Sequence, residues 1–532
     1  MEHFRVVFQP DDKEVSIHRG ATLLEAAGQA GIVLTTPCGG KGTCRKCMVE
    51  LRPSGRRVLA CQYTVQRDLA VAVPSESRFY EHRILSRGLD RATEVQPTIV
   101  EKYRPSAGSG DILGLAVDIG TTTVVAKLID LADGHCLATQ ATLNPQVQFG
   151  DDVISRINYA RSEAASAELR KVILDCVNTL IAGLCAAAAV APDAIYETCV
   201  VGNTTMNHLF LGLPTQQLGV APYRAYSVEA QDSPPADLHL HINPAGNVHT
   251  VENIAGFVGS DTTAVALATD VDSVAGTTLV VDIGTNGELV LATRDHLYAA
   301  SCAAGPALEG ARIRHGSRAA EGAIEAVVIA DGDLGLDVIG DAPVRSICGS
   351  GLIDAVAVLL DLGVIDLTGR FAPAATVRPR LPQALAARLV EIEGQPAFCL
   401  AFDAGTSVPK VVLTQRDIRE VQLAKGAIRA GIRLLLKKLG ITEADLDSVL
   451  LAGAFGNYIR PSSAIRIGLL PNVPVERIHF VGNAAASGAV MLLLSEACRR
   501  RAAALTRRIQ YVEIAHEKDF ADVFAEAMLL SP

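Results

Sequence analysis

The sequence lacks the features that mark secreted, membrane-spanning and nucleic-acid-binding proteins. Its first residues, Met1 to Phe4, do not form a signal peptide. The longest apolar runs, such as residues 184–191, are too short or too rich in alanine to span a bilayer. The net charge is −10 and no long run of lysine or arginine occurs, which argues against nucleic acid as a main partner. We therefore expect a cytoplasmic protein that binds neither membranes nor nucleic acids.

The chain also lacks a secretory context for disulfide bonds, although it contains 12 cysteines. In a reducing compartment, cysteines bind metals or remain thiols. Of the 532 residues, 49% are hydrophobic and 20% are charged, which is an ordinary globular balance in a chain long enough for several cores. The composition predicts several domains, with metal or thiol chemistry in one of them.

Four cysteines near the N-terminus have the spacing Cys-x5-Cys-x2-Cys-x13-Cys. They are Cys38, Cys44, Cys47 and Cys61. Small residues in the loop between the first two let backbone N–H groups approach charged sulfur atoms, and such hydrogen bonds help to set a cluster's potential. Strands are predicted at residues 4–8, 13–17 and 48–51, and a helix after Thr22, with Glu25 completing a capping box. This order fits a β-grasp fold.

The spacing resembles that of the plant-type and vertebrate-type [2Fe–2S] ferredoxins, which implies that the four cysteines are cluster ligands. Two departures from the plant pattern are a first gap of five residues and a shorter final gap. A structural zinc site is the alternative, but zinc ribbons usually pair two Cys-x2-Cys motifs and only one is present here. The other eight cysteines have no ligand spacing, so we expect them to be small buried side chains.

Two similar turns follow apolar strands in the rest of the chain. The first is Asp118-Ile119-Gly120-Thr121-Thr122, and the second is residues 282–287, Asp-Ile-Gly-Thr-Asn-Gly. The glycines permit positive φ and close approach of backbone N–H groups to phosphate, and the threonines add hydroxyl groups. Asp118 and Asp282 can hold Mg²⁺ directly or through water. A single such turn is most simply a hairpin, but the duplication favours two half-domains that face one ligand.

A third turn rich in small residues, at 451–457, follows another apolar strand, and residues 348–355 and 481–489 begin as small-residue helices. This order resembles the superfamily of acetate and sugar kinases, Hsp70 and actin, over about residues 113–500. The resemblance implies that the first two turns bind phosphate and the third packs against adenosine. The implied nucleotide-binding residues are Gly120, Thr121, Thr122, Gly284, Thr285, Asn286, Gly287, Gly453, Ala454, Gly456 and Asn457.

Three other segments have polar residues that the two motifs do not explain. Residues 299–311 carry Ser301 and Glu309 among small residues; they favour either close approach of a planar ligand or partner, or a tight helix entry at Pro306. Residues 202–208 form a polar turn that opens a helix, in which His208 is expected to be structural. In residues 151–157, Asp151 is predicted to cap a helix whose Asp152 and Arg156 pair at the surface.

The combination of a ferredoxin-like domain and this ATPase fold resembles the ATP-dependent reductive activators of corrinoid proteins. The matching features are the four cysteines, both Asp-Ile-Gly-Thr turns, the Gly202 to Met206 run and the loop from Ser301 to Gly310. The resemblance implies an ATP-hydrolysing reductase that returns Co(II) to Co(I) in the corrinoid protein of a methyltransferase system. It further implies a low-potential electron donor and a homodimer. Some members carry an additional middle domain, for which the linker here leaves no room.

The predicted fold class is therefore α/β multidomain. A β-grasp [2Fe–2S] domain at residues 1–82 and a linker at 83–112 precede a duplicated ribonuclease-H-like ATPase domain with halves at 113–275 and 276–532. The predicted cofactors are the [2Fe–2S] cluster, ATP and Mg²⁺. The predicted catalytic residues are Asp118, Asp282, Glu288, Ser301 and Glu309. The alternatives are a small-molecule kinase and a nucleotide-binding redox sensor, each with a fused ferredoxin domain.

Overall fold

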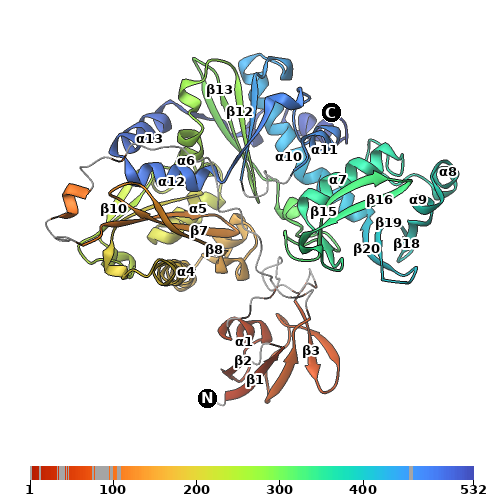
Figure 1. Cartoon of the computed structure of the whole chain (residues 1–532), viewed down its shortest axis with the longest axis horizontal. Coiled ribbons are helices and arrows are strands. Elements are labelled where there is room, and N and C mark those ends of the chain that lie inside the picture. Colours follow the sequence, from red (N-terminus) through yellow and green to blue (C-terminus); the bar gives the residue numbers. More distant parts are fainter. Residues whose placement is uncertain are drawn as a thin grey trace.

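The computed structural model describes residues 3–10, 13–30, 32, 34, 42, 45, 47–74, 77, 95, 100–104, 110–453 and 459–532. Their strands form one five-stranded sheet, two six-stranded sheets and two three-stranded sheets. Figure 1 shows the first six-stranded sheet at the left, the second at the upper centre, the small sheets at the right and the N-terminal sheet below. The mixed α/β, multidomain fold class predicted from the sequence is confirmed.

The N-terminal sheet has the order β2-β1-β5-β3-β4. Its first strand β1 pairs antiparallel with β2 and parallel with the central strand β5, which is the β-grasp arrangement. The capping box at its helix is formed, because Thr22 N donates to Glu25 Oε2 at 2.6 Å and Glu25 N donates to Thr22 Oγ1 at 3.2 Å. The elements are β1 (His3–Gln9), β2 (Lys13–His18), α1 (Leu23–Gln29), β3 (Met48–Arg52), β4 (Arg56–Leu59) and β5 (Leu69–Ala72).

The two six-stranded sheets repeat one strand pattern. In the first, β6 pairs parallel with β9 and antiparallel with β7, which pairs antiparallel with β8. In the second, β12 pairs parallel with β21 and antiparallel with β13, and β13 pairs antiparallel with β14. The first sheet contains β6 (Leu113–Ile119), β7 (Thr123–Asp130), β8 (Cys136–Leu143), β9 (Ile195–Gly202), β10 (Gln231–Ser233) and β11 (Asn247–Thr250). The second contains β12 (Thr278–Ile283), β13 (Gly287–Ala292), β14 (Leu297–Cys302), β21 (Ser448–Ala452), β22 (Ile478–Gly482) and β23 (Gln510–Tyr511).

Helices from both parts of the chain cover these sheets. α4 (Glu163–Ala188) packs on β7 and β8, and α10 (Gln415–Leu439) packs on β13 and β14. α12 (Ala484–Leu494) follows β22 of the second sheet but packs on β6 and β9 of the first, beside α6 (Ser260–Ala268). This crossing joins the two halves through a common core. The other helices of this region are α3 (Val153–Tyr159), α5 (Thr204–Leu211), α11 (Pro461–Arg466), α13 (Glu496–Arg508) and α14 (Phe520–Ala527).

The two small sheets interrupt the second half between β14 and α10. α7 packs on β15, and the hydrophobic core of this region is continuous with that of the second sheet. The elements are β15 (Ala323–Ala330), β16 (Asp333–Val338), β17 (Ser346–Ile347), α7 (Gly349–Asp361), α8 (Ala374–Val377), α9 (Gln383–Ala387), β18 (Leu389–Ile392), β19 (Gln395–Phe402) and β20 (Pro409–Thr414).

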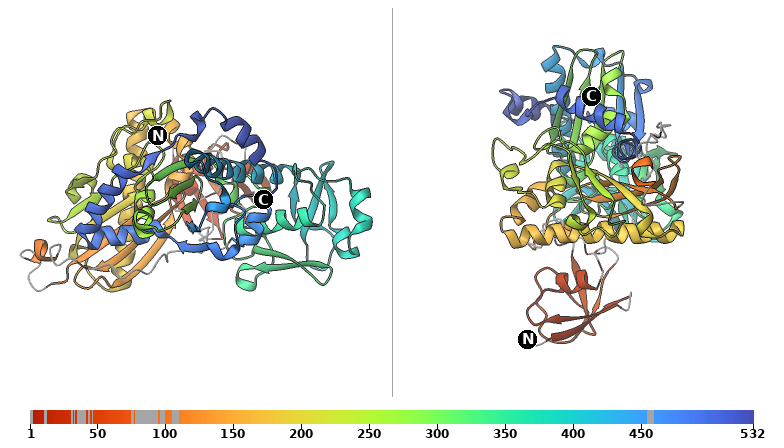
Figure 2. Two further views of the ribbon diagram at one scale, coloured as in Figure 1. Left: turned by 90° about the horizontal axis from the view of Figure 1, so that it is seen from above. Right: turned by 90° about the vertical axis from the view of Figure 1, so that its left-hand side faces the viewer.

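By length and composition alone, α4 is the one described helix that could cross a membrane. The sequence argument, which considered only short apolar runs, did not anticipate it. Leu169, Ile173, Val177 and Leu184 of this helix are buried in the core that it shares with β6 and β7. Figure 2 shows α4 lying along one face of the main body, as a core helix does.

The prediction for the helix near residue 151 was wrong in two respects. Its N-cap is Asp152, not Asp151, because Asp152 Oδ1 accepts a hydrogen bond from Ser155 N at 2.7 Å. Arg156 does not pair with Asp152 at the surface. It is fully buried and donates to backbone carbonyl groups, including that of Thr121.

Candidate functional site

The two predicted phosphate loops meet at one cavity between the two six-stranded sheets. Residues 120–123 join β6 to β7, and residues 284–286 join β12 to β13. The hydroxyl oxygens of Thr122 and Thr285 lie 3.0 Å apart. The cavity has a volume of about 230 Å³ and is lined by both loops. Turns from opposite halves of the chain therefore face a common space, as the duplication predicted.

Besides Glu309, four carboxylates line this cavity. Asp118 ends β6, Asp282 ends β12, Glu288 begins β13, and Asp261 lies in the first turn of α6. Asp282 and Glu288 are directly opposite each other on neighbouring strands, so their side chains point to the same face. The sequence predicted three of these residues, and the structure adds Asp261.

Burial raises the pKa of each of these carboxyl groups, and for Asp118, Asp282 and Glu288 the charge of a neighbouring carboxylate adds to the rise. Burial, with the charges of Asp261 and Asp282, raises the pKa of Asp118 to about 7, although a hydrogen bond from Asn483 opposes the shift. Burial and the charge of Asp261 raise the pKa of Asp282 to about 7. Burial raises the pKa of Asp261 to about 6 and that of Glu288 well above its ordinary value. A cation in the cavity would reverse these shifts.

The first loop is held by side chains of its own half. Asn144 Nδ2 donates to the carbonyl of Gly120 at 2.9 Å, and Asn203 Nδ2 donates to Thr121 Oγ1 at 2.8 Å. Arg156 donates from Nη2 to the carbonyl of Thr121. Each contact uses a carbonyl or hydroxyl oxygen of the loop, and the N–H of Gly120 donates to the carbonyl of Thr123 at 2.9 Å within the turn.

The second loop is held by a carboxylate. Thr285 Oγ1 donates to Glu309 Oε1 at 2.7 Å, and Glu309 Oε2 lies 3.6 Å from Arg318 Nε. Glu309 ends the 3-10 turn Pro306–Glu309, with Pro306 in its first turn. The tight helix entry at Pro306, one of the two alternatives for this segment, is therefore present, and close approach of a planar ligand or partner stays a prediction.

Helix N-termini add to the positive potential of the cavity. α7 begins at Gly349 and α12 at Ala484, and Ser350 and Ala485 line the cavity. Asn203, the N-cap of α5, lines it as well. Unpaired N–H groups at helix N-termini favour phosphate. Both segments that were predicted to begin as small-residue helices do so at this cavity.

The residues present fit Mg²⁺ with a nucleoside triphosphate. Mg²⁺ keeps most of its waters and is usually held by one or two carboxylates together with substrate phosphates. Asp118 and Asp282, one near the end of each half's first strand, both line the cavity and are the carboxylates that the sequence predicted for this ion. Among the described residues, no group of three or more His, Cys, Asp or Glu side chains is arranged as a metal site.

Gly453 marks where the third predicted turn enters the site. Its φ is +89°, and a Cβ atom there would lie 2.5 Å from Asp282 Oδ1. Only glycine suits both the left-handed backbone and this close approach. The other three residues predicted for this turn, Ala454, Gly456 and Asn457, lie outside the described residues.

Cys47 and Cys61 lie together in the N-terminal domain. Their sulfur atoms are 3.4 Å apart, both residues are buried, and neither forms a disulfide. Gln62 Nε2 lies 3.7 Å from Cys61 Sγ and can donate to a thiolate there. A buried pair of thiols with an amide donor fits two ligands of an iron–sulfur cluster. Cys38 and Cys44 lie outside the described residues.

Comparisons with known proteins agree with this division of the chain. A family model for the 2Fe-2S iron-sulfur cluster binding domain matches residues 4–76, and one for the C-terminal domain of RACo, the ASKHA domain, matches residues 276–532. The chain is 32% identical over 587 residues to the corrinoid activation enzyme RamQ of Eubacterium limosum, with 98% of each chain covered. The chain belongs to the family of corrinoid activation enzymes.

The chain is also similar to two further proteins that act on corrinoid proteins by their names. The structure of a reductive activator for a corrinoid, iron-sulfur protein matches with a TM-score of 0.72 and 32% identity, over 99% of this chain and 98% of that chain. The [Co(II) methylated amine-specific corrinoid protein] reductase of Methanosarcina barkeri is 25% identical over 422 residues, covering 72% of this chain and 70% of that protein.

One prediction about the family was wrong. A model of the RACo middle region matches residues 113–274, so the corrinoid activation enzyme described here does not lack this region. The matched residues form the first six-stranded sheet and its helices. The linker length was a poor guide, because the middle region is the first half of the nucleotide fold and not an insertion before it.

The argument for the loop glycines also needs correction. Gly120 and Gly284 do not have positive φ. Gly120 is required by contact instead, because a Cβ atom would lie 2.8 Å from the carbonyl oxygen of Thr123. A Cβ atom at Gly287 would lie 2.8 Å from Ile428 of α10. The glycines therefore allow tight turns and close helix packing.

Ser301 lies at the rim of the site. It is directly opposite Glu288 on the neighbouring strand β14, so Asp282, Glu288 and Ser301 form one row across three strands. On the side of β14 away from β13, β23 pairs only at Tyr298 and Ala299, and no described strand pairs with Ser301 on that side. Ser301 is thus next to both the carboxylates and an open sheet edge.

His208 has a structural role. It is buried, its Nδ1 lies 2.7 Å from the carbonyl of Thr204, and its Nε2 accepts from the backbone N–H of Tyr226 at 3.1 Å. Burial lowers the pKa of His208, which favours the neutral ring that these contacts require. The Gly202 to His208 run thus joins the first phosphate loop, through Asn203, to the segment at residue 226.

Proposed function

We propose that this protein uses its [2Fe–2S] cluster and ATP hydrolysis to return the corrinoid of a partner protein from Co(II) to Co(I). The observation that carries the proposal is the match to a corrinoid activation enzyme over 98% of both chains, which includes the cluster domain and the ATPase fold together. One electron moves from the reduced cluster to cobalt, and ATP and water become ADP and phosphate.

Energetics explain why ATP is needed. Plant-type clusters have potentials near about −400 mV, and the resemblance implies a lower potential for the Co(II)/Co(I) couple. For one electron, about 59 mV changes the equilibrium tenfold, so the transfer is unfavourable alone. Nucleotide can assist only by binding more tightly to the arrangement of domains in which transfer occurs.

At the nucleotide site, the chain's own residues would divide the work as follows. The backbone N–H groups of both loops, with Thr122 and Thr285, bind and orient the phosphates. Asp118 and Asp282 hold Mg²⁺, which when bound neutralises phosphate charge. Glu288, in the row with Asp282, is the candidate base for the attacking water. The negative charge of Asp261 raises the pKa of Glu288, so Glu288 binds a proton more tightly. Glu309 orients Thr285.

At the cluster, Cys38, Cys44, Cys47 and Cys61 would be the four ligands, with the Gln62 amide beside Cys61. We place the corrinoid of the partner near Ser301, at the open edge of the second sheet. The remaining parts of the proposal are a low-potential electron donor, a homodimer and a cytoplasmic location. Only the location has support in the structure, because the described cysteines are free thiols, as in a reducing compartment. We keep domain boundaries at residues 82, 112 and 275.

The test is anaerobic. The reduced protein is mixed with a Co(II) corrinoid protein of a methyltransferase system, and the visible spectrum is followed with and without ATP. Co(I) should form only when both ATP and the cluster are present. Cys61→Ser should abolish the cluster's absorption and the reduction while ATP hydrolysis continues. Reduction that proceeds at the same rate without ATP would contradict the proposal.

A further inference from the structure

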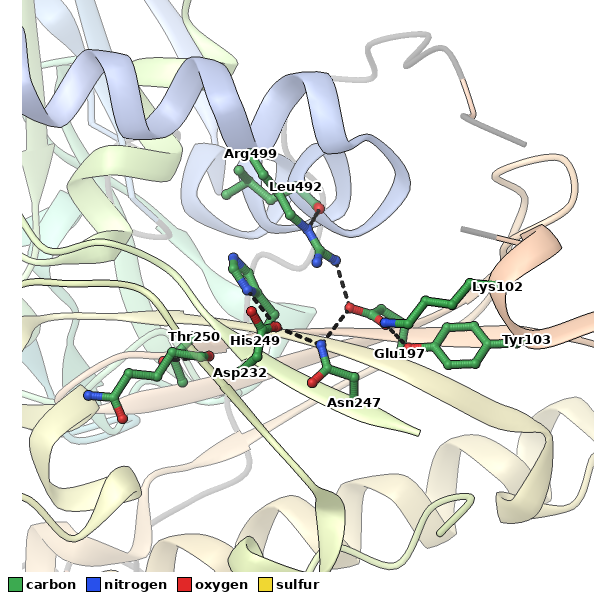
Figure 3. A network of polar contacts seen from close by, with 10 residues as sticks. Lys102, Tyr103, Glu197, Asp232, Asn247, His249, Thr250, Leu492 and Arg499 are labelled. Atoms are coloured by element: carbon green, nitrogen blue, oxygen red, sulfur yellow. Dashed lines mark hydrogen bonds and ion pairs between the residues drawn. The ribbon is translucent and has the colours of Figure 1, made fainter. Parts of the chain in front are cut away.

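A buried carboxylate far from the cavity gathers groups from three parts of the chain (Figure 3). Glu197, on β9, is 1% exposed. Its Oε1 accepts from Arg499 Nη2 at 2.9 Å and from Asn247 Nδ2 at 3.1 Å, and its Oε2 accepts from the hydroxyl of Tyr103. A buried carboxylate is stable only when it is paired and hydrogen-bonded. The partners of Glu197 belong to α13, to β11 and to the end of the predicted linker.

The linker end is held by its ring as well as by its hydroxyl. Tyr103 lies in the helical residues 100–104 and is 4% exposed. Its ring centroid is 5.3 Å from that of Tyr196. Lys102 Nζ lies 4.7 Å from the Tyr103 centroid and 3.7 Å from Glu197 Oε2. Docking of these residues therefore depends on the charge and position of Glu197.

One rigid element connects Glu197 to the first phosphate loop. From Glu197, β9 continues to its last residue Gly202, and the next residue, Asn203, donates to Thr121 Oγ1 at 2.8 Å. Six residues of strand span about 20 Å. A shift of the first loop is therefore passed along a buried central strand.

A second rigid element connects Arg499 to the same cavity. α12 begins after Asn483, whose side chain hydrogen-bonds Asp118, and the carbonyl of Leu492 near its other end accepts from Arg499 Nε at 2.8 Å. Eight residues of helix span about 12 Å. β9 and α12 thus each have one end at the nucleotide site, and their other ends are joined through Arg499 of α13, which bonds both the Leu492 carbonyl and Glu197.

We propose that Glu197 is a positioning residue that couples nucleotide at the phosphate loops to docking of residues 100–104, and so positions the cluster domain for electron transfer. The inference rests on the proposed nucleotide site. A nucleotide that contacts Thr121 and the N-terminus of α12 together fixes one end of both elements. This favours the arrangement in which their other ends are paired, and the docked linker end is stabilised with them.

The test is hydrogen exchange by mass spectrometry on the whole, cluster-loaded protein, with and without ATP and Mg²⁺. In the wild type, ATP should slow exchange in the peptides that cover residues 118–123 and 100–104, the second by about fivefold or more. Tyr103→Phe keeps the ring but removes the donor, and Glu197→Gln removes the charge. In both variants ATP should still slow exchange at 118–123 and no longer at 100–104.

Functional readouts separate coupling from folding. Both variants should hydrolyse ATP at rates within about twofold of wild type, while the corrinoid reduced per ATP hydrolysed falls about fivefold, the lower end of allosteric coupling. If Glu197→Gln does not fold, Tyr103→Phe carries the test alone.

Two matched controls test the specificity of the effect. Tyr511→Phe removes another tyrosine–glutamate hydrogen bond, from the Tyr511 hydroxyl to Glu513 Oε2 at 2.7 Å. Arg501→Gln removes another ion pair of α13, to Asp272. Both should keep the ATP effect at residues 100–104.

The outcomes are distinct. If ATP slows exchange at 118–123 in the wild type and leaves 100–104 unchanged or faster, the coupling is wrong and the nucleotide site stands. If ATP slows exchange at neither segment, the nucleotide site itself is wrong.

Discussion

The two phosphate loops share a motif, but the protein supports them by opposite means. The first loop accepts hydrogen bonds, because Asn144, Asn203 and Arg156 donate to its carbonyl and hydroxyl oxygens. The second is bound by an acceptor, because Thr285 donates to Glu309. Donors that bind oxygens of the first loop fix it as a platform. A carboxylate that competes with phosphate for the Thr285 hydroxyl makes the second loop responsive to the ligand. Duplication therefore kept the turn while its support diverged.

The largest effect should separate the chemistry of the two loops. Asp282 is in a row with Glu288, whereas no carboxylate is opposite Asp118 on β7. Asp282→Asn should lower the rate of ATP hydrolysis by about 10³-fold, because it also disturbs the candidate base Glu288. Asp118→Asn should lower the rate by about 10²-fold. Steady-state phosphate release measures both. A larger loss in Asp118→Asn would reverse the assignment.

The next effect concerns stability, and here the larger loss should come from the variant at the first loop. Arg156→Met leaves the carbonyls of Gly150 and Thr121 without their buried donor and should lower the free energy of unfolding by about 3 kcal/mol. Arg318→Met, beside the second loop, should cost about 1 kcal/mol, because its partner Glu309 keeps the bond from Thr285. Denaturant unfolding of the two variants provides the comparison. Equal losses would mean that the first loop is not the more firmly held.

A smaller effect tests the responsive loop. Glu309→Gln keeps the shape of the side chain but weakens its hydrogen bond with Thr285. Because Glu309 then competes less with phosphate for the Thr285 hydroxyl, the KM for ATP should fall by about tenfold with little change in kcat. Asn203→Ser provides the matched change at the first loop. There the loss should appear in kcat and KM together, because the platform itself moves. A change in kcat alone for Glu309→Gln would show that this carboxylate takes part in chemistry.

The smallest effect is one of pH. Since burial raises the pKa of Asp118 and Asp282 to about 7, the folded protein binds protons more tightly than the unfolded chain, and these groups reduce stability as the pH rises from about 4 to 7. In EDTA without nucleotide, Asp118→Asn should raise the Tm by about 3 °C at pH 7.5 and by less at pH 5. Differential scanning calorimetry at both pH values measures this. An increase that does not depend on pH would contradict the shifted pKa.

The sequence predicted those parts of the site that are local. Asp118 and Asp282 each stand with their glycines in a short contiguous motif between apolar strands. The cysteine spacing is likewise a pattern of residues close together in the sequence. The capping box of Thr22 and Glu25 was predicted correctly because all of its atoms come from four consecutive residues. Duplication added the expectation that the two motifs face one ligand.

The parts that were missed depend on contacts between distant residues. Asp261 reaches the cavity only because α6 packs beside α12, and the one signal that could have found it is the small-residue helix start at Gly259-Ser260-Asp261. Arg156 looked like a surface residue because an i, i+4 carboxylate was available at Asp152. Its actual partners are backbone carbonyls, which no side-chain pattern reveals. The role of Glu197 requires residues from 103 to 499 to be brought together.

The crossing of α12 has a consequence for how the protein is made. During synthesis the sheet face of β6 and β9 remains without its cover until residues 484–494 leave the ribosome, although the strands themselves are complete some 280 residues earlier in the case of β9 (Gly202 to Ala484). The N-terminal domain has all of its strands by residue 72 and can fold while the rest is still being translated. Cluster insertion can therefore precede formation of the nucleotide cavity, and a ribosome-bound chain would expose an apolar surface that chaperones recognise. Truncation between the end of the first six-stranded sheet and α12 should give a chain that aggregates through this uncovered sheet, although its N-terminal domain folds.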